Sequence, residues 1–492
     1  MKKILIIGGG AAGLSAGIYA QKSGYEALIC EKQNIAGGGL SFWEREGHHI
    51  DNCIHWLIGT NKNTEMYRTW CELGVLGDAD LYCKQRLYTS NSSGGSLSLD
   101  RDLDKLQNDM LSLSPRDEKE IRSLIKAVRT LEGYFGIAGK NHDERLSIEK
   151  PLFRLPNLLK YYPLSLEDLA ARFHHPVIKD FIVSFMPAKF ASLALIFTMA
   201  NFCGANADLP IGGSAYVKER LEENFLSLGG KIEYGKEAVA VKTKGRKVVS
   251  VSFLDGSEYS ADEYIFTIDP ALLFGRMIDC PMPAGLASQY KKRKRFSAVQ
   301  CAFECDLPTL PFEGEETLEI PEDLRVVLPG HHVNLRYEGH EKSYSPKGKT
   351  LLQAMIYCSE EAAVSYIEAK HHSKEAYQKQ KEEIAECISA LTVKQFPFLA
   401  GKLRAIDVWT PSTYQRYLGT EVGSFMSFAF PKSSIPRELS NRVASFNHLY
   451  LAGQWLQMPG GLPIAVTSGK KAILRIVKQD RIRKQTKTAK RP

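Results

Sequence analysis

The sequence predicts an α/β fold built on a parallel sheet, with an α+β region attached to it. Residues 3–31 read as a strand, a glycine-rich turn, a helix and a second strand, which is the pattern of a parallel βαβ unit. Farther along, a mostly helical stretch is followed by alternating strand-like runs. A chain of 492 residues also exceeds the usual size of one domain, so we expect two regions with cores of their own.

Composition indicates a folded protein outside the membrane core. Hydrophobic residues make up 44% and charged residues 24% of the chain, which are ordinary globular values. The opening "MKKILIIGGG" has too few apolar residues for a secretory signal, so we expect a cytoplasmic protein. The charge-free run from Phe190 to Ala207 contains Asn201 and Asn206 and is short for a bilayer span. It predicts a buried helix instead.

Cysteine and histidine usage predicts no metal site. The ten cysteines include no C-x-x-C pair, which argues against zinc, iron–sulfur and dithiol redox chemistry. Histidines occur as adjacent pairs, such as His48/His49, whose side chains point apart on a strand or helix.

The first βαβ unit carries a nucleotide-binding fingerprint. Gly8, Gly10 and Gly13 have the G-x-G-x-x-G spacing that suits a tight turn, a close approach of pyrophosphate and helix packing on the strand. Phosphates would then lie at the N-terminus of the helix, where free N–H groups favour negative charge. Glu31 ends the second strand eighteen residues after Gly13 and is placed to bind a ribose hydroxyl. The acid argues against NADP and leaves NAD or FAD.

A second glycine cluster, Gly37 to Gly39, follows in "EKQNIAGGGLS", and an NAD domain has no need of it. With this segment the chain resembles the phytoene desaturase and retinol saturase-like flavoproteins of the amine oxidase superfamily, over nearly its full length. The other stretches that carry the resemblance are "FWEREGHHIDNCIHWLIG", "LPIGGSAYVKERLEENFLSLGGKIEYGKEAVAV", "DGSEYSADEYIFTIDP", "TPSTYQRYLGTEVGSFMSF" and "LYLAGQWLQMPGGLP". The resemblance implies FAD, held by a discontinuous Rossmann-like domain of the glutathione-reductase type with an inserted α+β substrate domain.

The same resemblance implies which residues bind the cofactor. The backbone near Val239 would meet the adenine, and Gly460 and Gly461 would place backbone against the isoalloxazine, with Pro463 at the first helical position. Two departures from the family pattern stand out, because the usual arginine after the second glycine pair is Gly39 and the usual acid after "AG" is Gln454. The expected cofactor-binding set is Gly8, Gly10, Ala12, Gly13, Glu31, Lys32, Gly38, Gly39, Val239, Gly453, Gln454, Gly460, Gly461, Leu462 and Pro463.

The expected domain boundaries follow these motifs. Residues 1–65, 208–275 and 440–478 would form the FAD-binding domain, and 66–207 and 276–439 the substrate domain. The first insertion reads as mostly helical. The second combines strand-like runs with one long polar helix from about Glu360 to Leu391, and residues 479–492 form a basic tail.

The catalytic candidates each have a structural alternative. His55 in "IHWL" could face the flavin as a proton donor with Trp56 as a wall, or both could be structural. Arg416 and Tyr417 could orient a polar end of the substrate, or could pair with an acid such as Asp407 or Glu421 as scaffold.

Charge suggests a membrane as a partner. From Lys470 onward ten Lys or Arg and one Asp carry a net +9, which leaves −1 for the rest of a chain whose total is +8. The tail and the cluster Lys291 to Arg295 could dock on the anionic inner face of a membrane, or could be solvated surface. No aromatic residues interleave the clusters, so nucleic acid is not expected.

The leading functional hypothesis is an FAD-dependent oxidoreductase that acts on carbon–carbon bonds of a hydrophobic, polyene-like substrate through hydride transfer at flavin N5, by desaturation, saturation or isomerisation. One alternative is an amine-oxidase-like enzyme for a small polar substrate. Another is a non-catalytic flavin-binding protein at a membrane. Only one dinucleotide fingerprint occurs, so the expected electron acceptor is oxygen, a quinone or a separate reductase.

Overall fold

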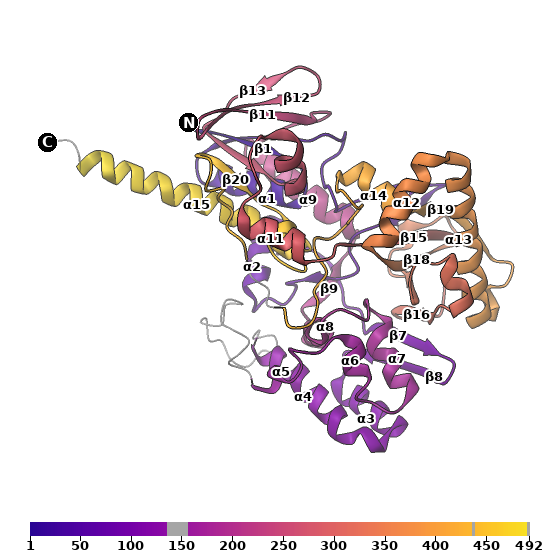
Figure 1. Cartoon of the computed structure of the whole chain (residues 1–492). Helices are drawn as coiled ribbons and strands as arrows, with labels where there is room; N and C mark the ends of the chain where they lie inside the picture. Colours follow the sequence, from indigo (N-terminus) through magenta and orange to yellow (C-terminus); the bar gives the residue numbers. More distant parts are fainter. Residues whose placement is uncertain (135–155, 435–437, 490–492) are drawn as a thin grey trace.

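The computed structural model describes residues 1–134, 156–434 and 438–489 (Figure 1). The part that contains the glycine fingerprint is a five-stranded sheet in the order β10–β2–β1–β14–β20, in which every neighbouring pair is parallel. The strands come from distant parts of the chain: β1 (Lys3–Ile7), β2 (Glu26–Cys30), β10 (Lys231–Glu233), β14 (Glu263–Phe266) and β20 (Leu449–Leu451).

Both faces of this sheet are covered, which explains why β1 is a continuous apolar run. Ile4 and Ile6 belong to a core shared with helices α1 (Ala11–Lys22), α9 (Gly213–Ser227) and α15 (Leu462–Ala489). Leu5 and Ile7 point the other way, into a core with an antiparallel sheet of β11 (Ala238–Lys244), β12 (Lys247–Phe253) and β13 (Glu258–Tyr259). Alternate residues of one strand therefore hold two layers together.

A second, seven-stranded sheet has the order β19–β15–β18–β17–β16–β7–β8. All its pairings are antiparallel except that of β16 with β7. Helices α12 (Glu360–His372) and α13 (Lys374–Gln395) contribute Tyr366 and Ile384 to the core beneath it. Its strands are β7 (Arg86–Ser92), β8 (Gly95–Asp100), β15 (Phe296–Cys305), β16 (Glu315–Glu319), β17 (His332–Tyr337), β18 (Thr350–Ser359) and β19 (Leu403–Trp409).

A helical cluster packs at the β7–β8 end of the seven-stranded sheet (Figure 1). It contains α3 (Leu103–Leu113), α4 (Glu118–Tyr134), α5 (Pro156–Leu159), α6 (Leu166–Ala170), α7 (Pro176–Ser184) and α8 (Ser192–Cys203), which share one core with β7 and β8. Nine of the twelve residues of α8 are buried, so the charge-free run does form a buried helix. Among the described residues, no helix is long and apolar enough to cross a membrane.

Smaller elements connect these parts. They include the hairpin of β3 (Phe42–Arg45) and β4 (His48–Asp51), and a small sheet of β5 (Leu57–Ile58), β9 (Ala207–Pro210) and β6 (Leu81–Tyr82). The remaining helices are α2 (Glu65–Glu72), α10 (Pro270–Leu272), α11 (Ala284–Lys292) and α14 (Pro411–Leu418).

The structure corrects three local expectations. The helix expected from Glu360 to Leu391 is two helices, because the chain is extended at Ser373, whose hydroxyl caps α13 by accepting from the Ala376 N–H. The first insertion contains a hairpin, β7–β8, which joins the sheet of the second insertion. Pro463 is the second residue of α15, not the first. The domain boundaries stay a prediction, and residues 490–492 of the basic tail lie outside the described residues.

Candidate functional site

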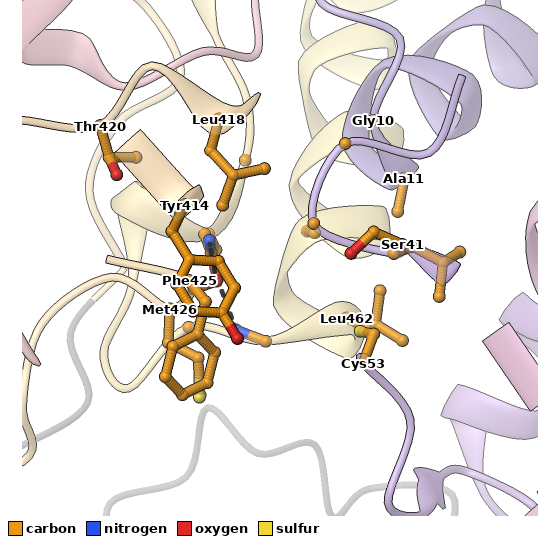
Figure 2. Close-up of a pocket in the computed structure, with 18 of the residues that line it drawn as sticks. Gly10, Ala11, Ser41, Cys53, Tyr414, Leu418, Thr420, Phe425, Met426 and Leu462 are labelled. Carbon is orange, nitrogen blue, oxygen red and sulfur yellow. Dashed lines mark hydrogen bonds between the residues drawn. The ribbon is translucent and has the colours of Figure 1, made fainter. Parts of the chain in front are cut away.

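A cavity of about 1870 Å³ lies between the carboxyl ends of the parallel strands and the seven-stranded sheet. In Figure 2, Gly10, Ala11 and Ser41 face Tyr414, Leu418, Thr420, Phe425 and Met426 across the open space. Every residue of the expected cofactor-binding set lines this cavity except Gly13, and so do His55, Arg416 and Tyr417. Residues more than 400 positions apart in sequence are thus brought to one place.

The three fingerprint glycines have different reasons to be glycine. Gly8 has φ +103°, and a Cβ on Gly13 would lie 2.0 Å from the Gly8 carbonyl oxygen, so the turn itself requires both. Gly10 has an extended backbone, with φ −71° and ψ 179°, and a Cβ there would come no nearer than 3.6 Å to another residue. No contact with another described residue requires glycine at position 10, so its open face fits a ligand that approaches the backbone.

The N-terminus of α1 adds donors at this point. Leu14 N–H donates to the Gly10 carbonyl and starts the helical ladder. The N–H groups of Ala11, Ala12 and Gly13 therefore have no acceptor within the helix. Ala11 and Ala12 line the cavity, so this end of the helix suits a phosphate.

Glu31 is buried and holds the glycine loop. Its Oε2 accepts from Gly9 N–H at 2.6 Å and its Oε1 accepts from Gln33 N–H at 2.9 Å. A carboxylate oxygen accepts two hydrogen bonds, so each oxygen keeps one lone pair for a ribose hydroxyl. Beside it, burial lowers the pKa of Lys32 despite the opposing charges of Glu31 and Glu237.

The second glycine cluster packs against the first. Gly37 N–H donates to the Gly9 carbonyl at 2.9 Å, and a Cβ on Gly38 would lie 3.1 Å from Gly10 Cα. Gly39 differs, because the nearest atom to a Cβ there would be the Phe425 carbonyl oxygen at 3.9 Å. At the position where the resemblance implies an arginine, the nearest protein atom thus leaves room for a side chain.

At the other end of the cavity, Gln454 connects two loops. Its Oε1 accepts from Gly461 N–H at 3.2 Å and its Nε2 donates to the Phe425 carbonyl at 3.1 Å. The amide is therefore engaged within the protein, and its contact with the cofactor stays a prediction. A Cβ on Gly460 would meet Ser427 Oγ at 2.7 Å, but one on Gly461 would meet nothing closer than 3.8 Å. Gly461 is thus the glycine that leaves room for a ring.

Asp269 is a cavity residue that the sequence did not single out. It is 2% exposed, and among the described side chains its Oδ2 is one of the buried oxygens without a hydrogen-bond partner. Burial raises the pKa of Asp269 to about 6, although Tyr290 and Ala271 N–H donate to its other oxygen. Open glycine positions, a free helix end, Glu31 and this unpaired oxygen together fit an extended polar cofactor such as FAD.

His55 lies at the cavity wall, held by a buried acid. Its Nδ1 is 2.6 Å from Oε1 of Glu315, whose side chain is 1% exposed. Burial acts to raise the pKa of Glu315, but His55, Lys84 and Arg336 outweigh it and the pKa is lowered. Glu315 is therefore a carboxylate that fixes the His55 ring, and the sequence offered no signal for it because β16 is 260 residues away.

Two catalytic candidates, Arg416 and Tyr417, lie on helix α14, and neither has the ion-pair partner that the sequence suggested. Arg416 and Tyr417 line the outer part of the cavity and are exposed, with the guanidinium 5.4 Å from the Tyr417 ring centre. Neither suggested acid pairs with Arg416, since Asp407 pairs with Arg45 and Glu421 pairs with Arg295.

Tyr414, on the same helix, is the buried member. Its hydroxyl accepts from Gln300 at 2.5 Å and Trp409 at 3.1 Å and donates to Asn52 Oδ1 at 2.9 Å. All four of these residues line the cavity. They form a neutral polar wall that sequence reasoning missed, because its members come from three distant stretches of the chain, at Asn52, Gln300 and Trp409 to Tyr414.

One arm of the cavity is apolar. It extends from His55 and Trp56 toward α8, and Trp56 stacks on Phe185 with ring centres 5.7 Å apart. We call it the apolar arm, and the side chains along it are Leu131, Met186, Phe190, Leu193, Ala194, Phe197, Phe296, Met355, Tyr357 and Phe430. Typical ligand pockets measure about 300–1,000 Å³, so a cavity of this size has room for a dinucleotide and a second ligand.

Known proteins match nearly the whole chain. The family described as flavin-containing amine oxidoreductase matches residues 11–476. Prolycopene isomerase of Daucus carota is 22% identical over 457 residues, which cover 86% of this chain and 71% of the relative. The 4,4'-diaponeurosporene oxygenase of Staphylococcus aureus strain MW2 is 21% identical over 505 residues, covering 95% and 97%.

Solved structures share the fold. An oxidoreductase from Methanosarcina mazei superposes with a TM-score of 0.61 at 17% identity, covering 97% of this chain and all of that one. Putrescine oxidase bound to putrescine gives 0.61 at 15% identity, covering 97% and 99%. Reduced UDP-galactopyranose mutase gives 0.57 at 16%, covering 97% and 96%. The Rossmann-like α/β fold expected for an FAD-binding chain is thereby confirmed.

These matches agree with the glycine-lined crevice, the free end of α1 and the buried Glu31. The chain belongs to the flavin-containing amine oxidoreductase family, and it is an FAD-dependent oxidoreductase.

Proposed function

We propose that the enzyme changes carbon–carbon bonds of a long hydrophobic polyene, by desaturation, saturation or isomerisation. The apolar arm carries this proposal. Its walls are aliphatic and aromatic, and none of the described lysines or arginines that line the cavity lies among them. A polar substrate would lose its hydration there without gaining hydrogen bonds, whereas a polyene would bury its whole length favourably.

The related proteins support the same substrate class. Prolycopene isomerase and 4,4'-diaponeurosporene oxygenase are named for carotenoid substrates. The bound flavin supplies hydride chemistry at its N5 position. The protein's own part is to hold the reacting bond, exclude water and place His55 at the junction of the two parts of the cavity.

His55 would serve as the polarising or proton-donating group. Glu315 fixes the ring through Nδ1, which leaves Nε2 as the nitrogen able to act toward a ligand. Arg416 and Tyr417 would at most orient a polar end group at the outer part of the cavity, since both are exposed. The electron acceptor we propose is oxygen, a quinone or a separate reductase.

The amine-oxidase alternative has less support. The described lysines that line the cavity are Lys32, Lys236, Lys370, Lys381 and Lys471. Lys32 lies beside Glu31 at the nucleotide end, and Lys471 pairs with Glu438 at 2.5 Å. None of these lysines lies in the apolar arm. An amine substrate bound there would also lack polar partners for its amino group.

Membrane contact stays a prediction, and fewer basic side chains are free for it than the sequence suggested. Lys294 pairs with Glu361, Arg295 pairs with Glu360 and Glu421, and Arg293 contacts Met458. Three of the five cations in the cluster Lys291 to Arg295 are therefore engaged within the chain. A docking face would depend more on Lys291, Lys292 and α15.

The direct test is turnover by the FAD-loaded protein. Phytoene and prolycopene in vesicles, and putrescine in buffer, would be incubated separately with oxidised and with reduced enzyme, and the products separated by chromatography. We expect a changed polyene in one of the two redox states and no oxidation of putrescine. Peroxide formation with putrescine and unchanged polyenes would contradict the proposal.

A further inference from the structure

The outer end of the cavity holds a concentration of positive charge that the flavin chemistry does not use. Arg45, Lys370, Lys381 and Arg416 line it, from β3, α12, α13 and α14. We call these four residues the cationic lobe. Helices α12, α13 and α14 lie together on the side of the seven-stranded sheet (Figure 1), and Arg45 on β3 is tied to β19 of that sheet by its ion pair with Asp407. None of these elements carries the glycine fingerprint.

The charges in the cationic lobe are poorly compensated. The carboxylates that line this part are Glu44 and Asp407. Asp407 accepts from Trp43 Nε1 and Arg45 Nε, both at 3.0 Å, and Glu44 is 2.7 Å from His49 Nδ1. Across the described part of the chain, no hydrogen bond or ion pair is seen for the amino groups of Lys370 and Lys381.

The excess of positive charge contributes to a lowered pKa at both lysines. Burial and the nearby Arg416 and Lys374 lower the pKa of Lys370. Burial, Arg45 and Lys370 lower the pKa of Lys381, against the opposing charge of Asp407. Half-buried cations that repel one another destabilise the free protein unless an anion joins them.

We propose that the cationic lobe binds a phosphate-bearing ligand separate from FAD. Two arginines offer planar pairs of donors and two lysines add mobile donors, which together match the several oxygens of a phosphate or pyrophosphate. The four cations of the lobe outnumber its two carboxylates, Glu44 and Asp407, so a ligand with a single carboxylate would not balance the remaining positive charge. Trp43 and Trp409, packed edge to face with ring centres 5.0 Å apart, line the cavity beside the lobe, and the exposed Arg45 and Arg416 leave its outer side open to solvent.

Calorimetry on the FAD-saturated protein tests this inference without any turnover. Inorganic pyrophosphate would be titrated at low salt into the native protein, into Lys370→Gln/Lys381→Gln and into Lys379→Gln. Lys379 lies on α13 and is 78% exposed beside Glu383, so it is a matched control outside the lobe. We expect binding in the native protein and the control, and at least roughly tenfold weaker binding in the double variant.

A second arm distinguishes a free ligand from a lipid headgroup. The same proteins would be sedimented with phosphatidic acid vesicles and with neutral vesicles. Vesicle binding that the double variant loses and the control keeps, with no heat from pyrophosphate, would support the same site with a headgroup as the ligand. Absence of both signals, or equal weakening in the Lys379 control, would overturn the inference.

Thermal melting tests whether Lys370 and Lys381 serve only to stabilise the fold. If the lobe is an empty anion site, removing two repelling cations leaves the melting temperature unchanged or raised, and pyrophosphate stabilises only proteins that keep both lysines. A lower melting temperature in the double variant, together with unchanged pyrophosphate binding, would overturn the proposal. Retained flavin absorbance in every variant separates this result from any failure of FAD binding or of the polyene reaction.

Discussion

In the glycine turn behind the nucleotide end of the cavity, a Cβ on Gly13 would lie 2.0 Å from a carbonyl oxygen. Along the apolar arm, by contrast, Ala194 and Leu193 line the cavity with a small and a large aliphatic side chain. In the first region the residue type is fixed at each position, because backbone atoms contact one another and leave no room for a side chain. The second is specified by shape and polarity, which many combinations of side chains satisfy. One region therefore holds an invariable cofactor, and the other can be adapted to a substrate.

The largest expected effect separates the two glycines of the fingerprint. Gly10→Val should fold, because its backbone is extended and its Cβ would make only van der Waals contact, no nearer than 3.6 Å, yet it should lose FAD, because the side chain would occupy the place of the phosphates. Gly13→Ala should instead lower the free energy of unfolding by about 3 kcal/mol through overpacking. Flavin absorbance and thermal melting of both variants provide the measurement. A Gly10→Val protein with stoichiometric flavin would contradict the placement of the pyrophosphate.

The second prediction concerns the apolar arm. Ala194→Phe narrows the apolar arm at α8 and leaves the two glycine clusters unchanged, so FAD content should stay normal. Turnover of a polyene should fall about a hundredfold, since loss of a well-fitted apolar contact is worth a few kcal/mol. Ala194→Val is the conservative control. Equal turnover in Ala194→Phe and the native enzyme would place the substrate elsewhere.

The contrast explains what could be predicted from sequence. The βαβ unit, Glu31 and the glycine pairs follow from local spacing, because each acts on its immediate neighbours in the chain. Tyr414, Asn52 and Glu315 could not be recognised, because each acquires its role from residues on other strands: Tyr414 from Gln300, and Glu315 from His55. Gln454 was recognised from its position, but its partners Gly461 and Phe425 became visible only in the fold.

A third prediction probes the pair that links the two regions. The pKa of Glu315 is lowered in the fold, so its charge stabilises the protein above its unfolded pKa, and this contribution is lost as pH falls through the folded value. Glu315→Gln should lower the free energy of unfolding at pH 7 by about 1–2 kcal/mol, because a neutral acceptor replaces a charged one for His55. The difference from the native protein should shrink on acidification below about pH 4, near the ordinary range of a glutamate. Melting curves across pH measure it, and a constant difference would mean that the carboxylate charge is not involved.

The smallest effect is expected at Gly39 in the second glycine cluster. Gly39→Arg restores the side chain that the resembled family carries, and the nearest atom to its Cβ would be 3.9 Å away, so the fold should accept it. A guanidinium near the pyrophosphate adds a charge-assisted hydrogen bond, partly offset by the entropy of ordering a long side chain. We expect FAD to bind roughly threefold to tenfold more tightly, as measured by fluorescence titration of the apoprotein, with Gly39→Gln as the uncharged control. If the arginine and glutamine variants bind FAD equally, the helix dipole of α1 already neutralises the phosphates, and the missing arginine reflects a crevice that is electrostatically complete without it.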